Sequence, residues 1–117
     1  MPIPKRVSSL MVVEDLPRAA ALYEGLGFTK VPTDDDRCIG YVAGETGIIL
    51  SDHEFATDCW GSGALAELAG RFVPYVFVER IDGETPGVVL ADSRTWFGTH
   101  ELLVRTDSGP LILAELA

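Results

Sequence analysis

Cysteine, histidine and basic residues are scarce in this sequence. Its 117 residues include two cysteines, two histidines and nine lysines and arginines, against eighteen aspartates and glutamates, so the formal net charge is −9. That charge disfavours binding to nucleic-acid phosphates or anionic membranes and favours cationic partners. No run approaches the roughly 18 apolar residues of a membrane span, and the N-terminal segment lacks the apolar core of a signal peptide. We therefore expect a cytoplasmic protein that contacts neither nucleic acid nor membrane.

The sequence also lacks the usual short catalytic motifs. It contains no G-x-S-x-G nucleophile elbow, no G-x-x-x-x-G-K phosphate loop and no C-x-x-C pair. Cys38 lies in a strand-like run and Cys59 in a polar connection, and without a secretory context both are expected as free thiols. No base is evident beside Cys59, so we interpret it as a plain thiol rather than a nucleophile.

The stretch from Val12 to Phe28 predicts the end of a strand, a helix and the start of a second strand. Asp15 is a good N-cap and Pro17 is tolerated in a first turn, so the helix should begin at about Leu16. Gly27 supplies the left-handed stop. Apolar residues recur at helical steps and form one stripe: Leu16, Ala19, Ala20, Tyr23 and Leu26.

The rest of the first half reads as strands followed by a connection. Alternation and turn residues predict strands at Val7–Val13, Phe28–Val31, Arg37–Ala43 and Gly47–Ser51. The acidic run Asp34–Asp36 is interpreted as a solvated turn. Between Asp52 and Arg71 the sequence is polar and interrupted by glycine, so we expect a linker with at most a short helix at Ala64–Ala69.

The second half repeats the first weakly. PYVFVE can be aligned with SLMVVE and SGPLILAEL with TGIILSD, and the second half is expected to hold strands at 71–81 and on both sides of a turn at Thr106–Pro110. Residues 81–98 stand where a second helix belongs, but Pro86 and three glycines make that helix short or absent. We therefore predict one domain, residues 1–117, with a first module at 1–52, a linker at 53–70 and a second module at 71–117.

Several motifs in this arrangement resemble the vicinal oxygen chelate superfamily, which includes glyoxalase I, extradiol dioxygenases and fosfomycin and bleomycin resistance proteins. The first half carries V-x-D-x-x-x-A-x-x-x-Y-x-x-LGF from Val13 to Phe28. The second half carries Trp96 to Glu101, similar to W-G-x-x-E, and Thr106 to Gly109 followed by Glu115, similar to the D-P-x-G turn and closing strand. The resemblance implies an α+β fold in which two βαβββ modules form a curved mixed sheet, with the second helix reduced.

The resemblance also implies where a metal would be bound. In metal-dependent members a histidine lies early in the first strand of each half and a carboxylate in the last strand, a ligand set suited to zinc, nickel, manganese or iron. Counting along the motifs places these positions on Ser8, Val73, Leu113 and a residue within 48–51. None of them is a histidine or a carboxylate, so we expect no metal and no other cofactor.

The two histidines are the candidates for displaced metal ligands. His53 belongs to the triplet Asp52-His53-Glu54, but adjacent residues of a strand point to opposite faces and cannot converge on one ion, so a solvated loop is the preferred interpretation. His100 stands beside Glu101 and has the same difficulty. It could instead face the pocket and contact a ligand.

Strand alternation places Ser8, Leu10 and Val12 on one face of the first strand. Val73, Tyr75 and Phe77 are expected on the matching face of the fifth strand, and the resemblance implies that this face lines a groove, with Met11, Val13, Val76 and Val78 packed against helices. Aromatic side chains bind planar or cationic ligands by stacking and cation–π attraction, although the same residues could serve only in core or interface packing. The candidate ligand-binding residues are Tyr75, Phe77, Trp60, Trp96, His100 and Glu101.

These observations favour a metal-free binding protein similar to bleomycin resistance proteins. It would be a homodimer that sequesters a hydrophobic or cationic small molecule in aromatic grooves shared by two chains. The alternative is a metal-dependent lyase, isomerase or dioxygenase of the same superfamily with displaced ligands such as His53, His100, Glu101 or Glu115. A third possibility is a degenerate member that serves only as a protein-interaction domain.

Overall fold

The computed structural model describes residues 3–81 and 85–116. Within these ranges the chain forms eight strands and three helices. In chain order they are β1 (Pro4–Val12), α1 (Leu16–Gly25), β2 (Thr29–Val31), β3 (Cys38–Ala43), β4 (Thr46–Ser51), α2 (His53–Trp60), α3 (Ala64–Leu68), β5 (Phe72–Val78), β6 (Val88–Arg94), β7 (Thr99–Thr106) and β8 (Gly109–Leu116).

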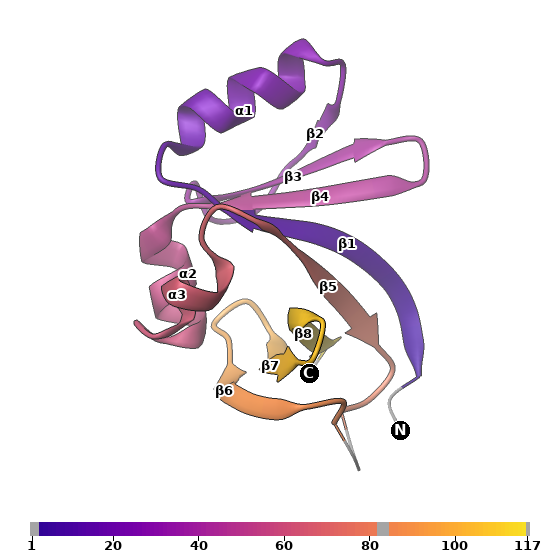
Figure 1. Ribbon diagram of the computed structural model, residues 1–117. Coiled ribbons are helices and arrows are strands. Elements are labelled where there is room, and N and C mark those ends of the chain that lie inside the picture. The colour runs from indigo at the N-terminus through magenta and orange to yellow at the C-terminus, as the bar shows by residue number, and fades with distance from the viewer. Residues whose placement is uncertain (1–2, 82–84, 117) are drawn as a thin grey trace.

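All eight strands join one curved sheet, in the order β2-β3-β4-β1-β5-β8-β7-β6 (Figure 1). The two halves meet where β1 runs antiparallel to β5, with Ser8 opposite Tyr75 and Leu10 opposite Val73. Each half repeats one pattern, since β1 pairs in parallel with β4 and β5 in parallel with β8. The predicted α+β fold, a curved mixed sheet built from two similar sets of strands, is confirmed.

Helix α1 begins and ends where its sequence predicts. The Asp15 carboxylate accepts a hydrogen bond from the Arg18 amide at 3.1 Å, and Pro17 lies in the first turn. Gly27, with φ of 96°, takes the left-handed conformation that follows the last turn. Leu16 and Ala20 pack on Tyr41, Ile48 and Leu50, so α1 covers the face of the first half that we call the outer face of the sheet.

The expectation for residues 53–70 was wrong in one respect. Besides the short helix α3, the segment forms α2, and His53 begins this helix instead of lying in a solvated loop. Asp52 caps α2 by accepting a hydrogen bond from the Phe55 amide at 2.8 Å. One side of α2 is buried because its apolar residues recur at helical spacing: Phe55, Ala56, Cys59 and Trp60.

Helices α2 and α3 pack on the opposite, inner face of the sheet. There they meet strand residues from both halves of the chain in a single core cluster, which includes Leu10, Val73, Leu103 and Ile112. These four side chains are almost fully buried. The linker is therefore part of the hydrophobic core, and its two helices lie together beside the curved sheet (Figure 1).

The outer face of the second half has no helix among the described residues. Val78, Leu102, Val104 and Leu113 form a buried cluster there, and Ile81 from the β5–β6 connection packs against it. The expected packing of Val76 and Val78 on a helix is thus wrong, because a connecting segment takes the helix's place. The expectation of a short or absent helix holds for the described part of 81–98, while residues 82–84 lie outside the described ranges.

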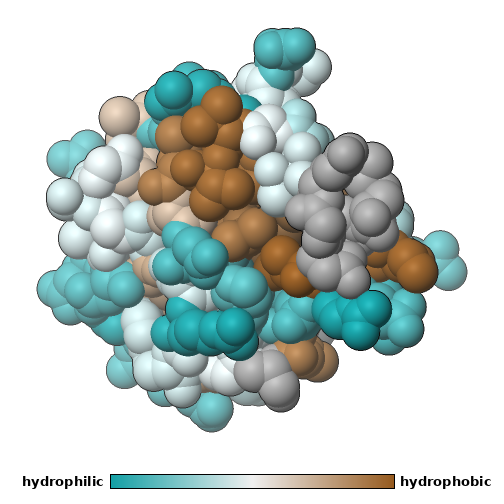
Figure 2. Space-filling model, turned by 90° about the horizontal axis from the view of Figure 1, so that it is seen from below, coloured by the Kyte–Doolittle hydropathy of each residue, from teal (hydrophilic) through white to brown (hydrophobic). Residues whose placement is uncertain are grey.

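Strands β2 and β6 form the two edges of the sheet. Val88, Val89 and Leu90 at the start of β6 are exposed. Figure 2 shows the side of the molecule on which β6 lies in Figure 1, and a hydrophobic area is visible there among polar side chains. Exposed apolar residues on a sheet edge favour association with another chain.

Candidate functional site

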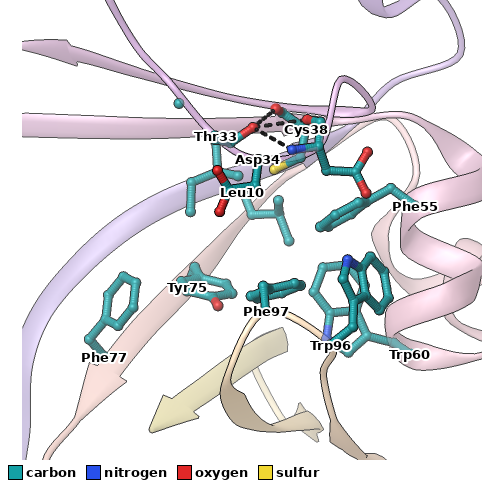
Figure 3. Close-up of a pocket in the computed structure, with 13 residues that line it drawn as sticks. Leu10, Thr33, Asp34, Cys38, Phe55, Trp60, Tyr75, Phe77, Trp96 and Phe97 are labelled. Atoms are coloured by element: carbon teal, nitrogen blue, oxygen red, sulfur yellow. Dashed lines mark hydrogen bonds between the residues drawn. The ribbon is translucent and has the colours of Figure 1, made fainter. Parts of the chain in front are cut away.

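A cavity of about 330 Å³ lies against the inner face of the sheet (Figure 3). It is enclosed by one chain, since Leu10, Cys38 and Ile49 line it from the first half and Tyr75 and Phe77 from the second. The remaining lining residues come from the β2–β3 loop, β3, α2 and the β6–β7 turn: Thr33, Asp34, Asp35, Gly40, Phe55, Trp60, Trp96 and Phe97. Both halves of one chain thus contribute to the lining of this cavity.

Six of the thirteen residues that line the cavity are aromatic. At its α2 end, Phe55 stacks on Phe97 with centroids 5.8 Å apart and meets Trp96 edge-on at 5.5 Å. At the strand end, Tyr75 and Phe77 meet edge-on at 5.0 Å. Figure 3 shows these rings around a common space. Such a wall suits an apolar or planar ligand.

Glu101 is fully buried beneath this wall and does not line the cavity itself. One carboxylate oxygen accepts a hydrogen bond from Trp60 Nε1 at 2.9 Å. The other accepts hydrogen bonds from the Tyr75 hydroxyl and from Thr99 Oγ1, the latter at 2.7 Å. Burial, followed by the charge of Glu101, raises the pKa of Tyr75 far above its ordinary value, so Tyr75 stays a neutral donor. Glu101 therefore fixes two rings of the cavity wall.

Arg37 lies beside the cavity and joins three segments of the chain. Its guanidinium contacts the carboxylates of Asp35 at 2.9 Å, Glu54 at 2.9 Å and Asp58 at 2.7 Å. It also lies over the rings of Phe55, at 5.7 Å from the centroid, and Trp96, at 5.6 Å. The arrangement connects the β2–β3 loop, α2 and the β6–β7 turn.

The acidic run that reads as a solvated turn has a second role in the structure. Asp34 and Asp35 both line the cavity. Asp35 is engaged by Arg37, which lowers the pKa of its carboxyl. Thr33 closes the turn by donating a hydrogen bond to the Cys38 carbonyl oxygen at 2.6 Å. No local pattern in the sequence indicates that this turn folds back over the inner face.

Both cysteines are free thiols near the cavity. Cys38 lines it, and burial, with a smaller contribution from Asp35, raises the pKa of this thiol to about 12. Burial likewise raises the pKa of Cys59 well above its ordinary value. The thiolate is the reactive form, and a raised pKa lowers its fraction at neutral pH. Neither thiol is therefore activated as a nucleophile.

The structure separates the candidate residues into three groups. Trp60, Tyr75, Phe77 and Trp96 line the cavity, and Glu101 bonds to two of them. His100 is next to Glu101 in β7 and so points to the outer face, where it lies 2.7 Å from Asp92. The sequence analysis missed Phe55 and Phe97. Phe97 directly follows Trp96, but the turn that brings both to the cavity is not encoded by strand alternation.

The residues at the metal-ligand positions do not fit a divalent metal. Ser8 and Val73 face inward with Tyr75 and Leu10, as predicted. Leu113 faces outward instead, because alternation along β8 turns its neighbours Ile112 and Ala114 inward, so the counted position was wrong by one residue. Within 3–81 and 85–116 no group of three histidines, cysteines or carboxylates is arranged to hold a metal ion.

No protein-family model and no curated protein matches the sequence. Among solved structures, a glyoxalase/bleomycin resistance protein/dioxygenase superfamily member from Vibrio splendidus 12B01 superposes with a TM-score of 0.60 at 13% identity, over 96% of this chain and 98% of that chain. A lactoylglutathione lyase from Agrobacterium tumefaciens covers 98% of this chain and 96% of its own at 14% identity, but a TM-score of 0.43 is too low to bear on function. The fold is that of the glyoxalase/bleomycin resistance protein/dioxygenase superfamily.

Proposed function

We propose that this chain is a metal-free binding protein that sequesters a hydrophobic or cationic small molecule. The observation that carries the proposal is the cavity of about 330 Å³, in which six of the thirteen lining residues are aromatic. Rings from α2, β5 and the β6–β7 turn converge there although they are far apart in the sequence. A cavity of this kind, with a few polar groups at one side, is the usual form of a small-molecule site.

The alternative is a metal-dependent lyase, isomerase or dioxygenase. Its displaced ligands would be His53, His100, Glu101 or Glu115. Only His100 and Glu115, which are paired across β7 and β8 on the outer face, are neighbours, while His53 begins α2. His100 and Glu101 point to opposite faces of β7, while Glu115 accepts a hydrogen bond from the Ile81 amide. Glu101 already accepts three hydrogen bonds. This distribution favours the binding protein over a metalloenzyme.

We further propose that the protein acts in the cytoplasm as a homodimer. The exposed residues Val88, Val89 and Leu90 on the edge strand β6 support association with a second copy. Among the described residues no helix has the length and apolar character needed to cross a membrane. Sedimentation equilibrium of the purified chain tests the dimer, and a monomer at every concentration would contradict it.

The binding proposal is tested with two matched phenylalanine variants. Phe97 lines the cavity and is 42% exposed, whereas Phe72 is 45% exposed and contacts Tyr23 away from the cavity. Hydrophobic and cationic aromatic compounds are titrated by calorimetry. We expect Phe97→Ala to weaken binding about tenfold or more through lost apolar contact and Phe72→Ala to leave it unchanged. Equal effects of the two variants would argue against this cavity as the site.

Metal content separates the two candidate functions. The untagged protein is incubated with nickel, zinc, manganese and iron, dialysed, and measured by elemental analysis. The binding-protein proposal expects no retained metal. About one tightly held ion per chain, lost in the His100→Ala variant, would support the enzyme instead.

A further inference from the structure

The two cavity rings that bond to Glu101 differ from the other rings of the wall. The indole N–H of Trp60 and the hydroxyl of Tyr75 both donate to the same buried carboxylate. Three donors satisfy Glu101, which as an ionised carboxylate can only accept. Hydrogen bonds in a buried network polarise one another, so both donors give electron density to their own rings. These rings attract a cation more strongly than isolated ones.

Three of the four other rings of the wall already have a cation beside them. Arg37 lies over Phe55 and Trp96, and Arg6 lies over Phe77 with its guanidinium carbon 4.4 Å from the ring centroid. No arginine or lysine is stacked on Trp60 or Tyr75 in the described part of the chain. Three aromatic surfaces around the cavity therefore already hold a cation, and among the rings without one, Trp60 and Tyr75 are the two that Glu101 polarises.

The charge around the cavity has the sign that a cation needs. Asp34 and Asp35 line it, Glu101 bonds to two of its rings, and Glu54 and Asp58 complete the ion pairs of Arg37. Against these five carboxylates stand the guanidinium groups of Arg6 and Arg37, which leaves an excess of three negative charges in this set. Low-dielectric walls strengthen such a field.

We infer that the cavity selects an organic cation, such as a quaternary ammonium carried on an aromatic or apolar body, whose charge lies against Trp60 and Tyr75. This inference rests on the proposed binding function and narrows its ligand class. An alkylated ammonium is the favoured cation because it has little hydration to lose on entering an aromatic cavity. Glu101 acts as a positioning residue, since it contacts the rings and not the ligand.

The test compares two compounds of one shape. The probe is 3-hydroxyphenyltrimethylammonium, and its neutral counterpart is 3-tert-butylphenol, in which carbon replaces the charged nitrogen. Affinities are measured by calorimetry at low and at physiological salt. We expect the cation to bind about tenfold to thirtyfold more tightly than the neutral compound, the range of a desolvated cation–π contact.

Glu101→Gln then removes the charge and retains hydrogen-bonding contact with all three partners, with the direction reversed at the two hydroxyl groups. Its amide oxygen can accept from Trp60, and its amide nitrogen can donate to the hydroxyl oxygens of Tyr75 and Thr99. The matched control is Glu24→Gln, because Glu24 accepts a hydrogen bond from the Tyr41 hydroxyl at 2.7 Å away from the cavity. We expect Glu101→Gln to bring the ratio of the two affinities close to one with the neutral affinity unchanged, and Glu24→Gln to preserve the ratio.

The outcomes separate this inference from the proposed function. Equal affinity of the wild-type protein for both compounds would overturn the cation preference and leave the binding function standing. Binding of neither compound, nor of the wider set titrated above, would overturn both. If Glu101→Gln lowers both affinities equally, Glu101 has only a structural role. Should that variant fail to fold, Trp60→Phe keeps a ring, removes the indole donor, and must also lower the ratio.

Discussion

Individual side chains near the cavity owe their chemistry to neighbours that the sequence does not reveal. Trp60 and Tyr75 could be proposed as groove residues from strand alternation and composition. Their shared partner Glu101 stands 41 and 26 residues away from them, so the hydrogen bonds depend on the complete sheet. The orientation of His100 could be predicted locally. His100 and Glu101 are adjacent in a strand, so only one of the two side chains can face the inner side of the sheet.

The reactivity of the Cys38 thiol tests whether this side chain is buried in the folded protein. Its thiol pKa is about 12 rather than 9.0, so below pH 9 its thiolate fraction is about a thousandfold lower than that of an ordinary cysteine. We expect iodoacetamide at pH 8 to label native Cys38 about a thousandfold more slowly than it labels the protein in urea. Mass spectrometry of the peptide measures the rate. Rapid labelling of the native protein would show that the thiol is solvated.

The same shift has a consequence for stability. Because the folded pKa lies above the unfolded value, the folded protein retains a proton that the unfolded chain releases between pH 9 and pH 12. The contribution of Cys38 is fully present below pH 9 and is lost as the pH rises through 12. Urea unfolding at pH 8.5 and 11 should therefore show a decrease in stability that is smaller in Cys38→Ala. An identical decrease in the variant would assign the effect to other groups.

At the scale of elements, the strands and α1 could be predicted because their signals are local. Asp15, Pro17 and Gly27 mark the ends of α1, and alternation with glycine turns marks the strands. Helix α2 is difficult to predict because it is short and begins within the polar triplet Asp52-His53-Glu54, which favours a loop. Its cap Asp52 and the helical spacing of Phe55, Ala56, Cys59 and Trp60 were present in the sequence.

The caps of α1 and α2 allow a comparison between two helices. Asp15→Ala and Asp52→Ala each remove one hydrogen bond to an amide of the first turn, and each should lower the free energy of unfolding by about 1 kcal/mol. Only α2 carries residues of the cavity wall, Phe55 and Trp60. We therefore expect Asp52→Ala alone to weaken ligand binding. Denaturant titration and calorimetry measure the two effects, and equal binding by both variants would contradict the role of α2.

At the scale of the whole molecule, both halves share one core. Leu10 and Val12 from the first half pack in the same cluster as Leu103 and Ile112 from the second, and α2 and α3 complete it. The sequence predicted two similar modules with a linker between them. It could not predict that the linker is buried, because the apolar surface that covers α2 comes from strands on both sides of it.

A shared core predicts a single unfolding transition. Far-UV circular dichroism and tryptophan fluorescence should give the same denaturant midpoint. Leu103→Ala should lower the free energy of unfolding by about 2–5 kcal/mol and move both curves together. The control is Val7→Ala in β1, which is 58% exposed and should change it by less than about 0.5 kcal/mol. Separate midpoints for the two probes would show that the halves unfold independently.

The position of β8 inside the sheet bears on how the chain reaches its native state. β8 lies between β5 and β7, although it follows both in the sequence. The hairpin of β6 and β7 therefore cannot join the sheet until β8 has paired with β5. The pairing of β1 with β5 likewise requires contact between segments that are some sixty residues apart in the sequence. Such distant pairings slow folding. During synthesis the cavity forms late, after the segment that supplies β8 has left the ribosome, and until then its aromatic residues remain open to other apolar surfaces.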